Sequence, residues 1–240
     1  MTRQEKLFYN VAFYQQDVAA MGLAAITTQR FAAAELAVIN RDLADCSAQE
    51  VVRWALGTGL RPFLSTSFGP QAAVMLDVVS GVDSSVPVVW VDTGYNLRDT
   101  YEVAEKLMQR LPLNMQVYTP RMSAERWNAL YGGIPQLDEP ELHEQFTRNI
   151  KIEPFERALK ELRPQLWLTG IRQSETAFRQ GLDIVTWDDR RGMLRVAPIF
   201  RWSEQDLRDY VRSRELPSCR HYFDPTKVDD SRECGLHTGL

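Results

Sequence analysis

Four short apolar runs, each followed by a segment of helical character, constrain the fold of this chain more than any other feature. The runs are residues 62–67, 86–91, 115–119 and 166–170, and the second of them is apolar almost without interruption. Such a run is typical of a strand in a parallel sheet that is covered on both faces. The alternation therefore predicts an α/β fold with a doubly wound, mainly parallel sheet.

The expected helices have recognisable starts. Ser47-Ala48-Gln49-Glu50 has the Ser-x-x-Glu form of a capping box and begins a helix that ends at residues 57–59. Residues 203–206 have the related Ser-x-x-Asp form and begin a last helix that reaches about residue 215. We expect further helices at 71–79, 97–110, 123–131 and 153–163, and shorter strands at 184–187 and 194–198.

The length of 240 residues suits one main hydrophobic core with short additions. We expect an N-terminal helical segment at residues 1–46, an α/β nucleotide-binding domain at 47–215, and a flexible C-terminal tail at 216–240. No internal repeat interrupts this pattern.

Charge and hydropathy exclude several classes of function. The chain has 28 Lys and Arg against 32 Asp and Glu, a net charge of −4, and no basic stripe, which argues against nucleic-acid binding. No apolar run approaches the roughly 18 residues that a membrane span needs. The first residues lead into no signal-peptide core, and the odd count of three cysteines argues against a disulfide framework. We therefore expect a soluble, cytoplasmic protein in a reducing compartment.

Polar or glycine-containing segments follow three of the expected strands. They are Ser65-Thr66-Ser67-Phe68-Gly69, Asp92-Thr93-Gly94 and Gly170-Ile171-Arg172. In an open parallel sheet, ligands bind where strand ends meet helix starts. The first segment precedes a helix, so its amides and hydroxyls could bind a phosphate, although it lacks the Gly-Lys-Ser/Thr of a Walker A loop. Each segment also has a simpler interpretation as a turn that satisfies its own hydrogen bonds.

Arginines gather around and beyond the fourth strand. Arg172 and Arg179 follow that strand, Arg157 precedes it, and three more arginines come at 190, 191 and 195. A guanidinium group suits bidentate binding of phosphate or sulfate. The alternative is a solvated charged surface in which these arginines pair with Glu175, Asp183, Asp188 and Asp189.

Cys234 lies in the polar segment Arg232-Glu233-Cys234-Gly235-Leu236-His237, an unusual setting for a core cysteine. It could supply a nucleophilic thiolate to a ligand held at the sheet. Two alternatives stay open: a zinc site made by Cys219, His221, Cys234 and His237, and a Cys219–Cys234 disulfide. Cys46 precedes a capping box and is expected to be inert.

Taken together, these residues resemble the thioredoxin-dependent phosphoadenylyl-sulfate (PAPS) reductases. The resemblance spans most of residues 60–240. It rests on five motifs in the family's order: Ser65 to Gln71, Val91 to Tyr95 with Thr100-Tyr101, Lys151 to Pro154 with Arg157-Ala158-Leu159, Gly170-Ile171-Arg172 with Arg179, and Glu233 to His237. The family's segment before the cysteine is longer than Pro217 to Glu233, and Gln173 stands where a second basic residue is common.

The resemblance implies an adenine nucleotide α-hydrolase-like fold, related to the ATP pyrophosphatases, in a cytoplasmic homodimer of sulfate assimilation. Cys234 would attack the sulfur of PAPS to form an S-sulfocysteine, which thioredoxin or glutaredoxin would resolve to sulfite. No cofactor and no metal is implied. The substrate-binding residues would be Ser65, Thr66, Ser67, Phe68, Gly69, Gln71, Asp92, Thr93, Gly94, Lys151, Arg157, Gly170, Arg172, Arg179 and His237.

Two other functions remain as alternatives. Adenylyl-sulfate (APS) reductases with an iron–sulfur cluster carry a Cys-Cys pair and a Cys-x-x-Cys pair. The first pair falls here on Phe146 and Thr147, and the chain has no Cys-x-x-Cys, so one chain cannot supply four thiolates. This favours PAPS, while a cluster-free APS reductase stays open. The other alternative is a nucleotide-binding protein without redox chemistry that is stabilised by the Cys/His zinc site.

Overall fold

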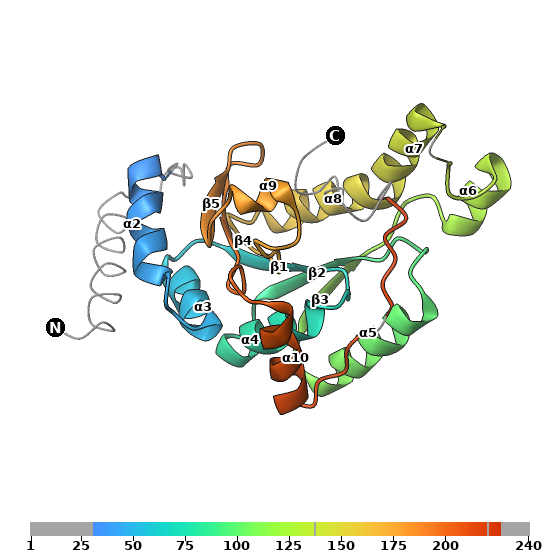
Figure 1. Ribbon diagram of the computed structural model, residues 1–240. Coiled ribbons are helices and arrows are strands. Elements are labelled where there is room, and N and C mark those ends of the chain that lie inside the picture. The colour runs from blue at the N-terminus through green and yellow to red at the C-terminus, as the bar shows by residue number, and fades with distance from the viewer. Residues whose placement is uncertain (1–30, 137, 220, 227–240) are drawn as a thin grey trace.

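The computed structural model describes residues 31–136, 138–219 and 221–226, which form a six-stranded sheet between layers of helices (Figure 1). The strand order is β3-β2-β1-β4-β6-β5, and every neighbouring pair is parallel except β5 with β6. The doubly wound, mainly parallel sheet is therefore confirmed. The strands are β1 (Pro62–Thr66), β2 (Pro87–Val91), β3 (Asn114–Tyr118), β4 (Leu166–Leu168), β5 (Val185–Asp188) and β6 (Met193–Val196).

Helices cover both faces of the sheet. Figure 1 shows α3, α4, α5 and α10 along one face and α8 on the other, with α6 and α7 beyond one end. The helices are α2 (Ala33–Leu43), α3 (Ala48–Gly57), α4 (Ala72–Val82), α5 (Arg98–Arg110), α6 (Ala124–Tyr131), α7 (Pro140–Thr147), the π-helical turn η1 (Arg148–Ile152), α8 (Glu153–Leu162), α9 (Ala177–Gln180) and α10 (Glu204–Ser213).

Successive residues of each central strand point to opposite faces, as the pleat of a strand requires. Leu64 of β1 and Leu168 of β4 belong to the large core on the side of α3, α4, α5 and α10. Phe63 and Trp167, next to them in sequence, belong to a smaller core that includes Phe155 of α8. Both faces are thus apolar, which explains why the strands read as continuous apolar runs.

The expected helix starts at residues 47 and 203 are confirmed in detail. Ser47 accepts a hydrogen bond from the amide of Glu50 at 3.3 Å, and the Glu50 carboxylate accepts from the amide of Ser47 at 2.7 Å. Ser203 and Asp206 form the same reciprocal pair at the start of α10. Of the expected N-terminal helical segment, only α2 lies among the described residues, and residues 1–30 lie outside them.

Three elements were not expected from the sequence: α7, η1 and the four-residue helix α9. The helix α7 begins at Pro140, and the chain continues through η1 into α8. Phe146 and Ile150 from this region pack with Trp127 of α6 in a third, separate apolar cluster. A π-helical turn within a longer helix often marks a functional site.

The order of the strands places a topological switch between β1 and β4. From β1 the chain adds β2 and β3 on one side, and then adds β4, β6 and β5 on the other. The connections leave these two strands in opposite directions, which opens a crevice at their carboxyl ends.

After α10 the chain continues as an extended segment, residues 216–226, which we call the strap. Apart from residue 220, the strap is described throughout and contains no helix or strand. Figure 1 shows it in red, running from the end of α10 past α5 toward α7. Across the described part of the chain, no helix combines the length and the apolar character needed to cross a bilayer.

Candidate active site

A pocket of about 200 Å³ lies at the carboxyl ends of β1 and β4, which is the switch point of the sheet. Its wall comes from the loop after β1 with α4, the loop after β4 with α9, the region of η1 and α8, the strand β2, and the strap. The residues that line it are Leu64, Ser65, Thr66, Ser67, Gly69, Gln71, Ala72, Met75, Leu76, Val89, Val91, Lys151, Phe155, Thr169, Gly170, Ile171, Glu175, Arg179, Tyr222 and Asp224.

The loop between β1 and α4 is anchored by Phe68. This residue has a left-handed backbone with φ of 52°, and its amide donates to Thr66 Oγ1 at 3.1 Å. Its fully buried ring packs edge-on against Trp90, with ring centroids 4.9 Å apart. Phe68 itself does not line the pocket, but Ser67 and Gly69 on either side of it do. Because α4 begins next to this loop, the positive end of its dipole favours an anionic ligand there.

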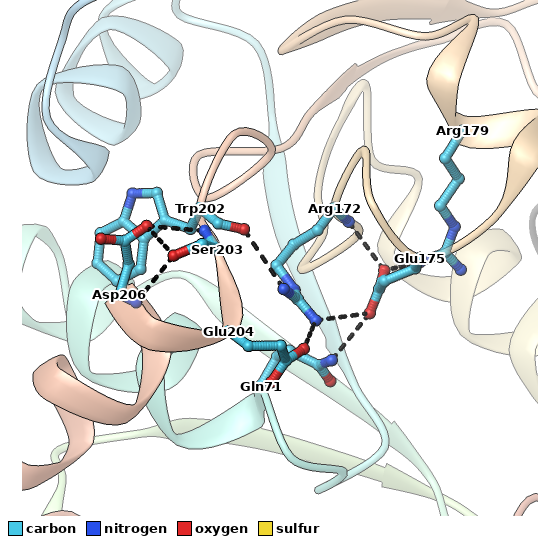
Figure 2. A network of polar contacts seen from close by, with 8 residues as sticks. All are labelled: Gln71, Arg172, Glu175, Arg179, Trp202, Ser203, Glu204 and Asp206. Atoms are coloured by element: carbon cyan, nitrogen blue, oxygen red, sulfur yellow. Dashed lines mark hydrogen bonds and ion pairs between the residues drawn. The ribbon is translucent and has the colours of Figure 1, made fainter.

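The arginines after β4 lie in a network of carboxylates rather than in open solvent (Figure 2). Arg172 is 2% exposed and forms ion pairs with Glu175 and Glu204, and Arg179 forms an ion pair with Glu175. Glu175 also accepts hydrogen bonds from the amide of Arg172 at 2.9 Å and from Gln71 Nε2 at 2.8 Å. Glu175 therefore links the two arginines, and of these two only Arg179 lines the pocket.

Lys151 projects from η1 into the pocket wall and meets the strap. Its ammonium group forms a buried ion pair with Asp224, and the two side chains are 9% and 6% exposed. It also donates to Thr226 Oγ1 at 3.1 Å. Burial alone would raise the pKa of Asp224, but the charge of Lys151 and hydrogen bonds from Lys151 and Thr226 together hold this pKa below its usual value.

The strap is held at two other places. The thiol of Cys219 lies 3.6 Å from Thr100 Oγ1 and 3.4 Å from Asp99 Oδ2, at the start of α5. The ring of Tyr222 packs against Gly69. It lies so close that a Cβ added to this glycine would come within 3.4 Å of the ring. The strap thus contacts α5, the loop after β1, and η1 in turn.

Asp92, Thr93 and Gly94 do not line this pocket. The Asp92 carboxylate accepts from the amide of Gly94 at 3.1 Å, from Asn96 Nδ2 at 3.0 Å and from the hydroxyl of Tyr101 at 2.7 Å. Burial and this bond to Asp92 raise the pKa of Tyr101 to about 12. Asp92 therefore organises the loop between β2 and α5.

Arg157 also lies outside the pocket lining. It forms an ion pair with Glu153 and donates to the carbonyl oxygen of Thr119 at 2.7 Å. Its guanidinium group lies over the ring of Tyr118, 5.5 Å from the centroid. These contacts join α8 to the end of β3.

The proposed nucleophile Cys234 and its neighbour His237 lie outside the described residues. Two members of the possible zinc set, Cys219 and His221, are described. In residues 31–136, 138–219 and 221–226, no three His, Cys, Asp or Glu side chains come together in a way that could hold a metal ion. Burial raises the pKa of the Cys219 thiol, and a hydrogen bond with Asp99 raises it further.

The model of the phosphoadenosine phosphosulfate reductase domain family matches residues 61–225. This range contains every residue that lines the pocket. The chain belongs to this family. The resemblance seen in the sequence is therefore confirmed.

Two curated proteins named phosphoadenosine 5′-phosphosulfate reductase are similar to this member of the family over nearly their whole length. The protein of a Synechococcus species is 37% identical over 228 residues, covering 84% of this chain and 97% of the relative. The protein of a Synechocystis species is 39% identical over 233 residues, covering 86% of this chain and 92% of the relative.

Solved structures agree with the fold, and one of them also agrees with the family assignment. A phosphoadenylyl-sulfate reductase from Candida auris, crystallised as a phosphate complex, matches with a TM-score of 0.70 and 25% identity over 80% of this chain and 91% of its own. An FMN adenylyltransferase from Candida glabrata matches with a TM-score of 0.52 and 14% identity over 89% of this chain and 66% of its own, which bears on the fold alone. The adenine nucleotide α-hydrolase-like fold is thus confirmed.

The site residues expected from the family motifs fall into two groups in the structure. One group surrounds the pocket: Ser65, Thr66, Ser67, Gly69, Gln71, Lys151, Gly170 and Arg179. The second group does not line the pocket: Phe68, Asp92, Thr93, Gly94, Arg157 and Arg172.

Sequence reasoning missed the contribution of the strap to the pocket. Tyr222 and Asp224 line it, and Thr226 contacts the lining residue Lys151. The sequence Asp224-Pro225-Thr226 held a partial signal, because Asp and Thr two residues apart often bond within a turn. Asp224 Oδ1 does accept from the amide of Thr226 at 3.0 Å. By contrast, no residue near Asp224 in the sequence predicts its ion pair with Lys151.

Proposed function

We propose that this protein reduces PAPS to sulfite and adenosine 3′,5′-bisphosphate. The observation that carries the proposal is that the family match includes the whole lining of a pocket at the switch point of the sheet. Two relatives that carry the name of this activity are aligned with this chain over more than nine-tenths of their own length. The nearly complete coverage of those relatives supports transfer of the whole activity.

The pocket offers the contacts that a nucleotide with a phosphosulfate group needs. The hydroxyls and amides of residues 65–69 and the start of α4 would bind phosphate oxygens. Lys151 and Arg179 bring positive charge to the same cavity. Met75, Leu76 and Ile171 supply apolar surface of the kind that an adenine base requires.

The chemistry would begin with the thiolate of Cys234. It attacks the sulfur of the phosphosulfate group, a sulfur–sulfur bond forms, and the bond from sulfur to the bridging oxygen breaks. The electron pair of that bond leaves on the phosphate oxygen of adenosine 3′,5′-bisphosphate. Cationic side chains assist because negative charge grows on this oxygen during the step.

The second half-reaction needs an external dithiol, which we assign to thioredoxin or glutaredoxin. One thiolate of the dithiol attacks the Cys234 sulfur, and sulfite leaves with the electron pair of the broken bond. The second thiol of the partner then closes a disulfide and frees Cys234. A cytoplasmic homodimer completes the proposal, since that compartment keeps such partners reduced.

Mass spectrometry of the protein after reaction with PAPS, without reductant, tests the proposal. We expect a sulfonate adduct on Cys234 and release of sulfite when thioredoxin is added. Cys234→Ser should form no adduct, whereas the control Cys46→Ser should react as the original protein does. If Cys234→Ser releases sulfite at the original rate, the proposed chemistry is wrong.

The same assay decides between PAPS and APS as the substrate. A specific site for the 3′-phosphate predicts a higher kcat/KM for PAPS, because only PAPS carries that group. A higher kcat/KM for APS would instead identify a cluster-free APS reductase.

A further inference from the structure

The last described residues of the strap are fixed to the pocket wall by a closed set of contacts. Asp224 bonds to the Lys151 ammonium through one carboxylate oxygen, and its other oxygen accepts from the amide and hydroxyl of Thr226, at 3.0 and 2.6 Å. The Thr226 hydroxyl lies in turn 3.1 Å from Lys151 Nζ. Asp224 therefore fastens both the strap and the η1 lysine at one point.

The position of Asp224 and Thr226 along the chain determines how far the Cys234 thiol is from the pocket wall in sequence. Cys234 follows Thr226 by only eight residues. Eight residues span at most about 28 Å when fully extended, so the whole pocket is within reach of a chain that starts at Thr226. Without this anchor, the next contact back along the strap is that of the Tyr222 ring with Gly69, twelve residues before Cys234.

Tether length sets the local concentration of the thiol. Starting at Tyr222, Cys234 would be twelve residues away instead of eight. The effective concentration of a tethered group falls with roughly the −3/2 power of the tether length, so the longer tether would lower it about twofold.

We infer that Asp224 is a positioning residue for the reaction, which fastens the strap to Lys151 and so shortens the stretch of chain between the wall of the substrate pocket and Cys234. The inference rests on the proposed function, because it gives Cys234 the role of nucleophile. Asp224 takes no part in the bonds that form and break.

The same ion pair helps to place the thiol but opposes binding of the anionic substrate. The charged residues that line the described part of the pocket are Lys151, Arg179, Glu175 and Asp224, two of each sign. An anionic nucleotide therefore meets a carboxylate right beside the lysine that would attract it. Removing the charge of Asp224 should strengthen nucleotide binding while it weakens the placement of the thiol.

The test compares Asp224→Asn and Thr226→Val with the control Asp209→Asn. Asp209 is on the exposed side of α10, where it pairs with Arg212, so its variant makes the same charge change away from the pocket. The measurements are the dissociation constant of adenosine 3′,5′-bisphosphate by calorimetry and the single-turnover rate of adduct formation on Cys234 with saturating PAPS.

For Asp224→Asn we expect about three- to tenfold tighter binding of the bisphosphate and about twofold slower adduct formation. Thr226→Val should slow adduct formation with little change in binding, because the pocket charge is kept. Asp209→Asn should leave both quantities unchanged. Opposite signs for binding and rate are the signature of positioning, since a collapsed pocket would weaken both.

Two results would overturn the inference. One is an unchanged rate of adduct formation in Asp224→Asn, and the other is a parallel loss of binding and rate, which would make Asp224 a structural residue. Both are read against an original protein that forms the adduct, so the proposed function stands in either case. If the original protein forms no adduct on Cys234, the proposed function fails and this inference fails with it.

Discussion

The indole nitrogen of Trp167 donates a hydrogen bond to the hydroxyl of Ser65, with 2.8 Å between the two atoms. Trp167 belongs to β4 and Ser65 to β1, the two strands whose loops form the pocket. The indole is fully buried and stacks on Phe63 at an interplanar angle of 19°. The bond thus links β1 to β4, the two strands on either side of the switch point.

Ser65→Ala should destabilise the protein by about 1–3 kcal/mol, because it takes the acceptor away from a buried N–H group. Ser67→Ala is the matched control, since Ser67 lies two residues farther along, in the loop after β1, and is exposed. Its effect should stay within about 0.5 kcal/mol. Urea denaturation followed by fluorescence measures both. Equal stabilities for the two variants would mean that the Trp167 bond contributes nothing.

Arg172 and Arg179 should respond differently to substitution, although they lie seven residues apart in one motif. Arg172 is buried outside the pocket lining and pairs with Glu175 and with the exposed Glu204, so Arg172→Ala removes a buried charge from this network. It should destabilise the fold by about 2–4 kcal/mol. Denaturant unfolding measures this loss.

Arg179 lines the pocket, and Arg179→Met keeps most of its apolar stem. This variant should cost about 1 kcal/mol of stability and weaken binding of adenosine 3′,5′-bisphosphate about ten- to a hundredfold. Calorimetric titration at a temperature where all variants are folded separates the two effects. Unchanged binding in Arg179→Met would remove Arg179 from the anion site.

The sequence predicts the sheet well because its signals are local. A few adjacent residues are enough to identify each element. Examples are the strand run Val-Pro-Val-Val-Trp-Val at 86–91 and the capping pairs that begin helices at 47 and 203. The loops at residues 65–69 and 170–172 follow from the rule that ligands bind at strand ends. The fold and part of the pocket could therefore be foreseen.

The remainder of the site depends on contacts between distant residues. Lys151 and Asp224 are 73 residues apart, and nothing in the composition of the strap marks where it crosses the sheet. Asp92 shows the same limit. One of its carboxylate oxygens accepts from Gly94, Asn96 and Tyr101, the last of which is nine residues away on α5.

Cys219 should react slowly with iodoacetamide in the folded protein. It is 7% exposed, and burial with the nearby Asp99 carboxylate raises its pKa, so the thiolate is a minor species near pH 8. We expect alkylation at least about tenfold slower than in the urea-unfolded protein, where the thiol is free. Peptide mass spectrometry after timed quenching measures the rate at this residue.

The reactivity of Cys219 also reports on the strap. Thr100→Val removes the neighbouring hydroxyl without removing the burial, and its labelling should stay slow. Rapid labelling of Cys219 in the original protein would show that the strap leaves α5 readily, contrary to the contacts with Asp99 and Thr100.

The ion pair between Asp224 and Lys151 should give stability a defined dependence on pH. The pKa of Asp224 is lower in the folded protein than in an unfolded chain, because Lys151 and Thr226 stabilise the carboxylate more than burial opposes it. The stabilisation is therefore fully present above the unfolded pKa of about 3.9, and it is lost as the pH falls through the folded pKa.

Asp224→Asn isolates this contribution, because asparagine cannot titrate. The difference in unfolding free energy between the original protein and the variant should be constant from about pH 5 to pH 7 and should shrink below about pH 4. Asp209→Asn, on the exposed face of α10, should show no such change. Urea denaturation at each pH gives the two curves. A difference that grows as the pH falls would mean that Asp224 is protonated in the folded protein, and that the strap is fastened to Lys151 by something other than an ion pair.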